Sequence, residues 1–125
     1  MVTNTLSDTN TVTVFVTGPV DDPKLSVDPE ILPVYGQYVV INFVLQTEII
    51  GCVFPDAGAV VITSPSLQFP LVSRTDANGL STKLFDFNSD EEDYHYTVSV
   101  DIKNLANTTH RILKFEIDPG IRNGD

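Results

Sequence analysis

Cationic side chains are scarce in this chain. Lysine and arginine together number 7, against 17 aspartates and glutamates, which gives a formal net charge of −10 over 125 residues. A surface this negative repels phosphate backbones and anionic headgroups, so we expect neither nucleic acid nor a membrane as a partner. Solubility is the simplest reason for such acidity. If the charge also serves recognition, it favours cations or basic proteins.

Cysteine is nearly absent as well, because Cys52 is the only one and no intramolecular disulfide can form. Cys52 lies within the apolar run 49–54, where a free cysteine usually behaves as a small buried hydrophobe. No cationic residue stands close to it in sequence to activate the thiol. We therefore predict a core position for Cys52.

Long apolar runs are missing too. No stretch approaches the roughly 18 apolar residues that a membrane-spanning helix needs. The first residues show neither the basic start nor the apolar segment of a secretion signal. We expect a soluble, cytoplasmic protein, with a different compartment only if a signal sequence has been removed.

The most regular pattern in the chain runs from Tyr94 to Ile102. Apolar or aromatic side chains occupy every even position, with small or polar ones between them. Successive side chains of a strand point to opposite faces, so this alternation predicts a strand with one buried face and one solvated face. Residue 95, a histidine, falls on the solvated face.

Strand-like segments separated by proline, glycine and aspartate turns account for nearly all of the remaining sequence. The run 38–45 is almost continuously apolar, which predicts a central strand buried on both faces. Residues 111–117 should close a hairpin with 94–102 and end at Asp118-Pro119-Gly120. No segment is typical of a stable helix. We predict one all-β domain over residues 1–125, an antiparallel β-sandwich, with flexible first and last few residues.

The alternation also predicts the core of this sandwich. The expected core residues are Val14, Phe15 or Val16, Val40, Phe43, Val61, Phe85, Tyr96, Val98, Val100, Ile112 and Phe115.

Two resemblances bear on the fold. Residues 93–100 resemble the penultimate strand of immunoglobulin-like sandwiches, in which a tyrosine near the start of the strand bonds back to the preceding corner; Tyr94 or Tyr96 would take that part. The chain has no tryptophan and no second cysteine, so it is not an antibody-type domain. The Asp28-Pro29-Glu30 element and the tail 115–123 are similar to Asp-Pro elements of a small bacterial group, the DP-EP family, which implies no activity for particular residues.

Catalytic and metal-binding patterns are weak. No serine has a nucleophile-elbow motif, and no cysteine–histidine spacing is typical of zinc. His95 and His110 fall on adjacent strands, but antiparallel pairing places His110 nearer Asn104 than His95. We predict no catalytic, cofactor-binding or metal-binding residues, no cofactor, and no enzymatic activity.

The acidic segment 86–93 is the best ligand candidate in the sequence. It begins Asp-x-Asn-x-Asp, as calcium loops do, but an EF-hand would need glycine at 91 and a bidentate glutamate at 97, where this chain has Glu91 and Thr97. A looser calcium site would combine Asp90, Glu92 or Asp93 with Asp76 or Asn78. We expect a solvated acidic corner instead, with no specific calcium site.

Three functional classes remain open. A non-catalytic module that binds a protein partner or itself is favoured. A calcium-assisted carbohydrate-binding domain is the alternative, and a hydrolase is a weaker one. Tyr35 and Tyr38 are the nearest approach to an aromatic ligand platform, but packing at a strand entry is the favoured interpretation for both.

Overall fold

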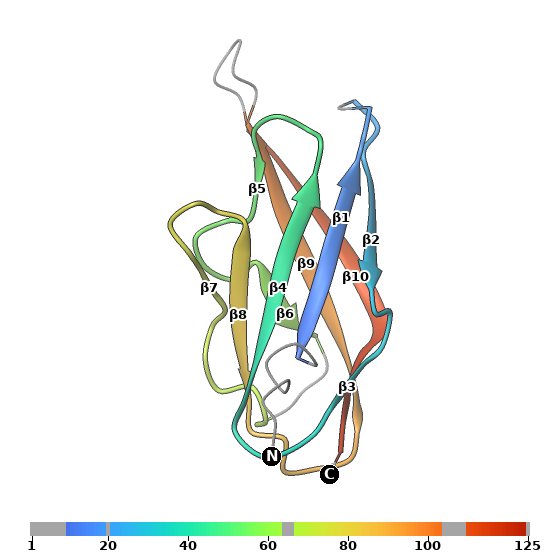
Figure 1. The fold of residues 1–125 in the computed structure, drawn as a ribbon, viewed down its shortest axis with the longest axis vertical. Helices are drawn as coiled ribbons and strands as arrows, with labels where there is room; N and C mark the ends of the chain where they lie inside the picture. The colour runs from blue at the N-terminus through green and yellow to red at the C-terminus, as the bar shows by residue number, and fades with distance from the viewer. Residues whose placement is uncertain (1–9, 20, 64–66, 104–109, 125) are drawn as a thin grey trace, which may run out of the picture.

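A computed structural model describes residues 10–19, 21–63, 67–103 and 110–124. Within these ranges the chain is all-β, as predicted, and forms two sheets whose strands run along the long axis of the molecule (Figure 1). No helix in the described part of the chain is long and apolar enough to cross a membrane. The predicted flexibility of the ends concerns mainly residues 1–9 and 125, which lie outside the described residues.

Sheet A contains five strands among the described residues, in the spatial order β2-β1-β4-β8-β7. Their bounds are Lys24–Asp28 for β2, Thr11–Thr17 for β1, Val39–Thr47 for β4, Ser81–Asp86 for β8 and Arg74–Thr75 for β7. Strands β1 and β4 are parallel, and the other pairs in this sheet are antiparallel.

Sheet B contains the other five strands of the described ranges, in the order β3-β10-β9-β5, with β6 also paired to β9. Their bounds are Leu32–Val34 for β3, His110–Asn123 for β10, Asp93–Lys103 for β9, Cys52–Val53 for β5 and Val60–Ile62 for β6. Strand β3 pairs with β10 in parallel. The sequence predicted an antiparallel sandwich, and most strand pairs are antiparallel, but each sheet contains one parallel pair, so both sheets are mixed. The parallel β1–β4 pair forms because the chain crosses to β3 in sheet B before it returns as β4.

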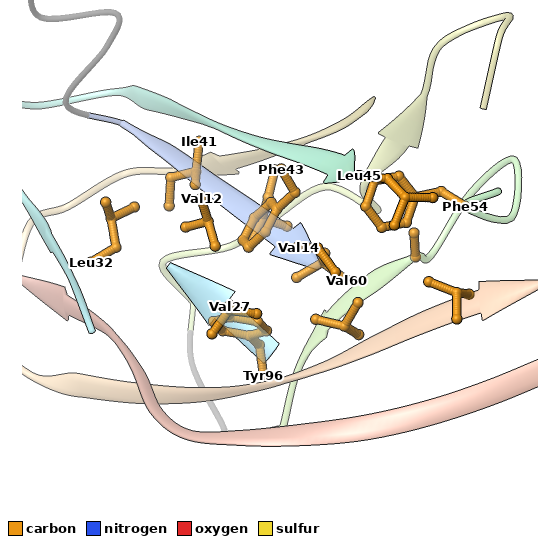
Figure 2. Packing of buried hydrophobic residues seen from close by; sticks show 14 of the residues in the cluster. Val12, Val14, Val27, Leu32, Ile41, Phe43, Leu45, Phe54, Val60 and Tyr96 are labelled. Atoms are coloured by element: carbon orange, nitrogen blue, oxygen red, sulfur yellow. The ribbon is translucent and has the colours of Figure 1, made fainter. Parts of the chain in front are cut away.

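The core lies between the two sheets and draws on both (Figure 2). The rings of Phe43 from sheet A and Tyr96 from sheet B meet edge to face across it, with centroids 5.3 Å apart. Six of the predicted core residues are buried: Val14, Val16, Phe43, Tyr96, Val98 and Val100. Cys52 is buried too, as its apolar surroundings predicted.

Several other core predictions are wrong. Val40, Val61 and Ile112 are exposed, and Phe85 and Phe115 are only partly buried, whereas of the alternatives Phe15 and Val16 it is Val16 that lies in the core. The error has one main cause in sheet A. Strand β4 is central, as predicted, but only its inward face is covered, so its second apolar face meets solvent. A central place in a sheet fixes a strand's hydrogen-bonding neighbours and not what covers its faces.

Strand β10 continues beyond the predicted stop at residues 118–120. Its register with β9 shifts between Ile117 and Ile121, and pairing then resumes up to Arg122. Gly120 makes this passage possible, because a Cβ atom there would collide with the Tyr96 ring. The irregularity therefore lets the end of β10 remain in sheet B, where it pairs with β3.

Candidate functional site

The acidic segment that follows β8 is a buried polar junction as well as a surface loop. Asp86, the last residue of β8, points inward and is fully buried. Its Oδ1 atom accepts hydrogen bonds from the backbone N–H of Asn88, at 2.9 Å, and from the side-chain amide of Asn123 in β10, at 3.2 Å. The carboxyl group thus ties the end of sheet A to the last strand of sheet B.

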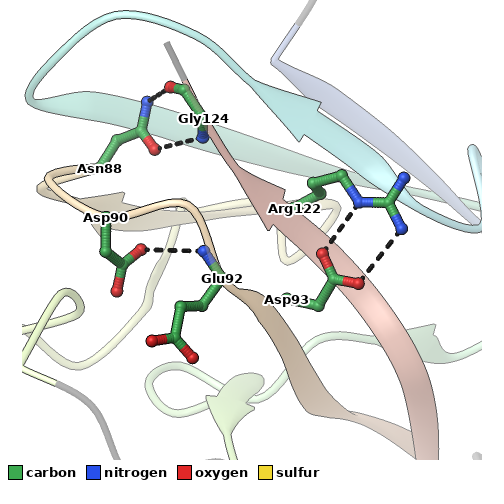
Figure 3. A network of polar contacts seen from close by, with 6 residues as sticks. All are labelled: Asn88, Asp90, Glu92, Asp93, Arg122 and Gly124. Carbon is green, nitrogen blue, oxygen red and sulfur yellow. Dashed lines mark hydrogen bonds and ion pairs between the residues drawn. The ribbon is translucent and has the colours of Figure 1, made fainter.

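Asn88 makes the second tie. Its side-chain amide donates to the backbone carbonyl of Gly124 at 2.6 Å, and its Oδ1 atom accepts the Gly124 N–H at 2.9 Å (Figure 3). The same amide also contacts the carbonyls of Val34 and Gly36. Asn88 has a φ of 52°, a left-handed conformation that asparagine tolerates better than most residues. These hydrogen bonds join the loop between β8 and β9 to the segment after β3 and to the end of β10.

Two buried oxygens of this junction have no hydrogen-bond partner among the described residues: Oδ2 of Asp86 and Oδ1 of Asn123. Burial disfavours the charged form of Asp86 and raises the pKa of its carboxyl group to about 6, although bonds from Asn88 and Asn123 act in the opposite direction. A proton on Oδ2 would supply a donor where the ionised group has none. The Asp86 carboxyl group therefore keeps its proton at mildly acidic pH, where an ordinary aspartate is already ionised.

Asp90 and Asp93 are occupied by structural contacts. Asp90 accepts hydrogen bonds from the Asn123 amide, the Tyr94 hydroxyl and the backbone N–H of Glu92. Asp93 forms a two-bond ion pair with Arg122 of β10, at 2.9 and 3.1 Å (Figure 3). The Arg122 guanidinium lowers the pKa of the Asp93 carboxyl. Much of the segment's negative charge thus braces the loop against β9 and β10.

The looser calcium site considered from sequence is not assembled. Asp76 and Asn78 lie in the turn before β8, and Asp90 lies in the loop after it, so they stand at opposite ends of this strand. Six strand residues span roughly 20 Å. Asp76 instead accepts a hydrogen bond from the Ser81 hydroxyl at 2.6 Å. The described residues contain no group of three or more histidine, cysteine, aspartate or glutamate side chains that could hold a metal ion.

The two histidines lie at different places along the β9–β10 hairpin. His95 is half-exposed, and its Nε2 atom lies 2.9 Å from Oδ1 of Asp118. The backbone of His110 pairs with Lys103, at the other end of the hairpin. The predicted separation of the two histidines is therefore confirmed.

Cys52 offers no accessible thiol. Burial raises the pKa of its thiol group. We expect Cys52→Ala to fold normally and to lose about 1 kcal/mol of unfolding free energy, the size typical of a single substitution. Native wild-type protein should react slowly with a thiol reagent and react fast in denaturant. Rapid labelling under native conditions would contradict the core assignment.

The outer face of sheet A carries a group of exposed and partly exposed apolar side chains, two of which, Val40 and Phe85, the sequence interpretation placed in the core. We call Tyr38, Val40, Phe85 and Phe87 the aromatic patch. The Tyr38 ring stacks on Phe85 with centroids 6.5 Å apart, and it meets Phe87 edge to face at 6.0 Å. Tyr38 is 66% exposed and Val40, which pairs with Phe85 across the strands, is 46% exposed. Tyr38 and Tyr35 are thus surface residues, not buried at the strand entry as favoured from sequence.

Tyr38 also has an uncommon backbone conformation. Its φ is 58°, in the left-handed region that bulky residues rarely adopt. The Tyr38 N–H donates to the carbonyl of Phe87 at 3.1 Å, which fixes the entry of β4 beside the end of β8. The sequence signal for this patch was present in the two apolar faces of 38–45 and in the spacing of Phe85 and Phe87.

A polar pocket of about 370 Å³ lies next to the aromatic patch in sequence. Its lining residues are Gly36, Gln37, Asn88, Ser89, Asp90 and Glu91. Gln37 precedes Tyr38, and Asn88 follows Phe87, so the pocket and the patch share their supporting backbone. The two carboxylates make the pocket suited to a cationic group.

Comparison of the sequence with models of known protein families, and with curated proteins, finds no match.

Proposed function

We propose that this chain is a non-catalytic binding module for a protein partner, and that the aromatic patch and the adjoining acidic pocket form its binding surface. The observation that carries the proposal is Tyr38, a 66% exposed aromatic ring on a left-handed backbone. Such a conformation costs about 1–2 kcal/mol, and residues that retain one cluster at functional sites. Exposed aromatic side chains are also the residues that most often dominate protein interfaces.

The charge of the pocket narrows the class of partner. Asp90 and Glu91 line it, and the whole chain carries a net charge of −10, so an approaching basic segment is attracted both locally and at long range. Tyr38 follows the lining residue Gln37 in sequence, and an aromatic ring can add a cation–π interaction to the attraction if the lysine or arginine of the partner reaches its face. The fitting partner is therefore a protein segment with an apolar anchor beside a basic residue.

An immunoglobulin-like fold remains part of this proposal. Tyr94, the second residue of β9, donates its hydroxyl hydrogen bond to Asp90 in the loop before the strand. In immunoglobulin-like sandwiches a tyrosine at the equivalent corner also bonds back upstream, although to backbone. The buried Tyr96 hydroxyl has no hydrogen-bond partner among the described residues, so Tyr94 is the better candidate of the two. The DP-EP resemblance and the cytoplasmic location stay predictions.

Peptide selection tests the binding surface. Peptides selected from a phage-displayed random library against the wild-type chain should be enriched in lysine or arginine next to an aromatic or aliphatic residue. Tyr38→Ala should weaken their binding by at least about tenfold, as for a central interface residue. Ile50→Ser is the matched control, because Ile50 is also exposed but lies in the turn after β4, at the other end of the sheet (Figure 1).

Two results would count against this function. If the selected peptides bind Tyr38→Ala as well as they bind the wild type, the binding surface does not include the aromatic patch. The second test is a glycan array. Glycan binding that requires calcium and is lost in Asp90→Asn would favour the carbohydrate-binding alternative over a protein partner.

A further inference from the structure

Among the described residues, one edge of strand β10 in sheet B has no neighbouring strand over most of its length. Strand β10 pairs with β9 on one side from His110 onwards, but β3 covers its other side only at residues 121–123. No described strand pairs with the other side of residues 112–117. An edge of this kind presents unpaired backbone groups that can accept another strand.

The direction of those backbone groups follows from strand β9. The Ser99 N–H donates to Ala59, and the His95 carbonyl accepts from Thr63, so the odd residues of β9 bond away from β10. The even residues of β9 therefore bond toward β10, to its odd residues. This leaves the N–H and C=O groups of Lys114 and Glu116 pointing to the free edge.

The side chains of the same stretch divide into two faces. Leu113, Phe115 and Ile117 face inward but stay only partly buried, because the described residues leave this flank of the core partly uncovered. Lys114 and Glu116 are exposed on the outward face. A groove of about 390 Å³ runs beside this edge, between β10 and the residues of β2 and Glu30-Ile31.

We propose that a second copy of this chain occupies the free edge, with the two β10 strands antiparallel around a two-fold axis at Phe115. In this register Lys114 lies opposite Glu116 of the partner subunit, and Glu116 lies opposite the partner subunit's Lys114. Both are hydrogen-bonded pairs, since their backbone groups point across the edge. Leu113 lies opposite the partner's Ile117 on the inward face, where both gain apolar cover.

The charges select this register over its neighbours. An axis at Lys114 would place two lysines directly opposite each other, and an axis at Glu116 would do the same with two glutamates; like charges in that position are destabilising. A shift by one residue pairs inward-facing with outward-facing side chains, which the alternation of the strand forbids. The edge is thus complementary to itself, as a two-fold interface requires, and this complementarity identifies a second copy as the partner.

The proposed pairing between the two β10 strands involves few residues. The irregularity of β10 between Ile117 and Ile121 and the β3 pairing beyond it limit the regular edge. We therefore expect a reversible dimer that forms with rising protein concentration, as small interfaces do. This surface lies on sheet B and is separate from the aromatic patch on sheet A.

Sedimentation velocity over a concentration series tests the proposal through a charge swap. The wild type should pass from a 13.7 kDa monomer to a species of twice that mass. Lys114→Glu and Glu116→Lys should each weaken dimerisation by about tenfold or more, because each places like charges opposite in both pairs. The double variant restores opposite charges and should dimerise like the wild type.

The double variant also separates pairing from net charge. Lys114→Glu changes the net charge from −10 to −12, Glu116→Lys changes it to −8, and the double variant returns it to −10. Circular dichroism should show an unchanged fold in all three, since both side chains are exposed. A wild type that stays monomeric, single variants that dimerise like the wild type, or a double variant that stays monomeric would each overturn the proposal. Tyr38→Ala should dimerise normally; loss of the dimer in that variant alone would place the interface on the aromatic patch instead.

Discussion

Val98→Asp is expected to leave the chain unfolded at neutral pH. Val98 lies in the middle of β9 with 0% of its surface exposed, and it is flanked by β10 on one side and β6 on the other. A carboxylate at this position would point into the cluster of buried hydrophobic residues. Burying it without a partner costs several kcal/mol, which is a large part of the roughly 5–15 kcal/mol that stabilises a typical domain.

Val61→Asp is the matched control for this experiment. Val61 pairs with Thr97, the residue before Val98, and is 50% exposed on the outward face of sheet B. The same substitution there leaves the new carboxylate in water, so the variant should keep the wild-type circular dichroism spectrum and a cooperative urea transition. A folded Val98→Asp protein with the stability of Val61→Asp would contradict the assignment of the core face of β9.

The stability of the wild type is expected to fall as the pH rises from 4 to 7.5, in part because of Asp86. The folded state raises the pKa of this buried carboxyl group from 3.8 to about 6. A group with a raised pKa contributes its full stabilisation below the unfolded-state pKa and loses it as the pH passes the folded-state pKa. The loss from Asp86 should amount to about 2–3 kcal/mol over this interval.

Asp86→Asn should remove this contribution. The amide keeps the Oδ1 acceptor for Asn88 and Asn123, and its N–H group stands where a proton on Oδ2 would stand. Urea unfolding at pH 4 and pH 7.5 should show the variant gaining about 2–3 kcal/mol relative to the wild type at the higher pH. Asp93 and Asp76 have lowered pKa values, so their stabilisation is lost only as the pH falls, and the comparison between variants cancels it.

Asp56→Asn, at an exposed carboxylate, is the control for the removed charge. Its difference from the wild type should stay nearly constant between the two pH values. If the difference in unfolding free energy between Asp86→Asn and the wild type is also the same at both pH values, Asp86 ionises in the folded state as freely as it does in water.

The alternation of side chains by itself determined much of this protein. Apolar residues at every second position placed Tyr96, Val98 and Val100 in the core, because a strand has only two faces and one of them must be buried. Turn residues separated the strands, and the surroundings of Cys52 predicted its burial. These are local properties, because each depends only on neighbouring residues and can be recognised in the sequence.

Only the tertiary structure decided what covers each face and which loops meet. Val40 and Phe85 look like core residues in sequence, but no second layer of described residues buries the outer face of sheet A. Asp86 reads as the first residue of an acidic loop, yet β10 returns beside it and brings Asn123 into contact across 37 positions of sequence. Burial and contacts between residues far apart in sequence depend on how the strands are ordered in the sheets. Strand order is a property of the whole chain, and local sequence patterns do not determine it.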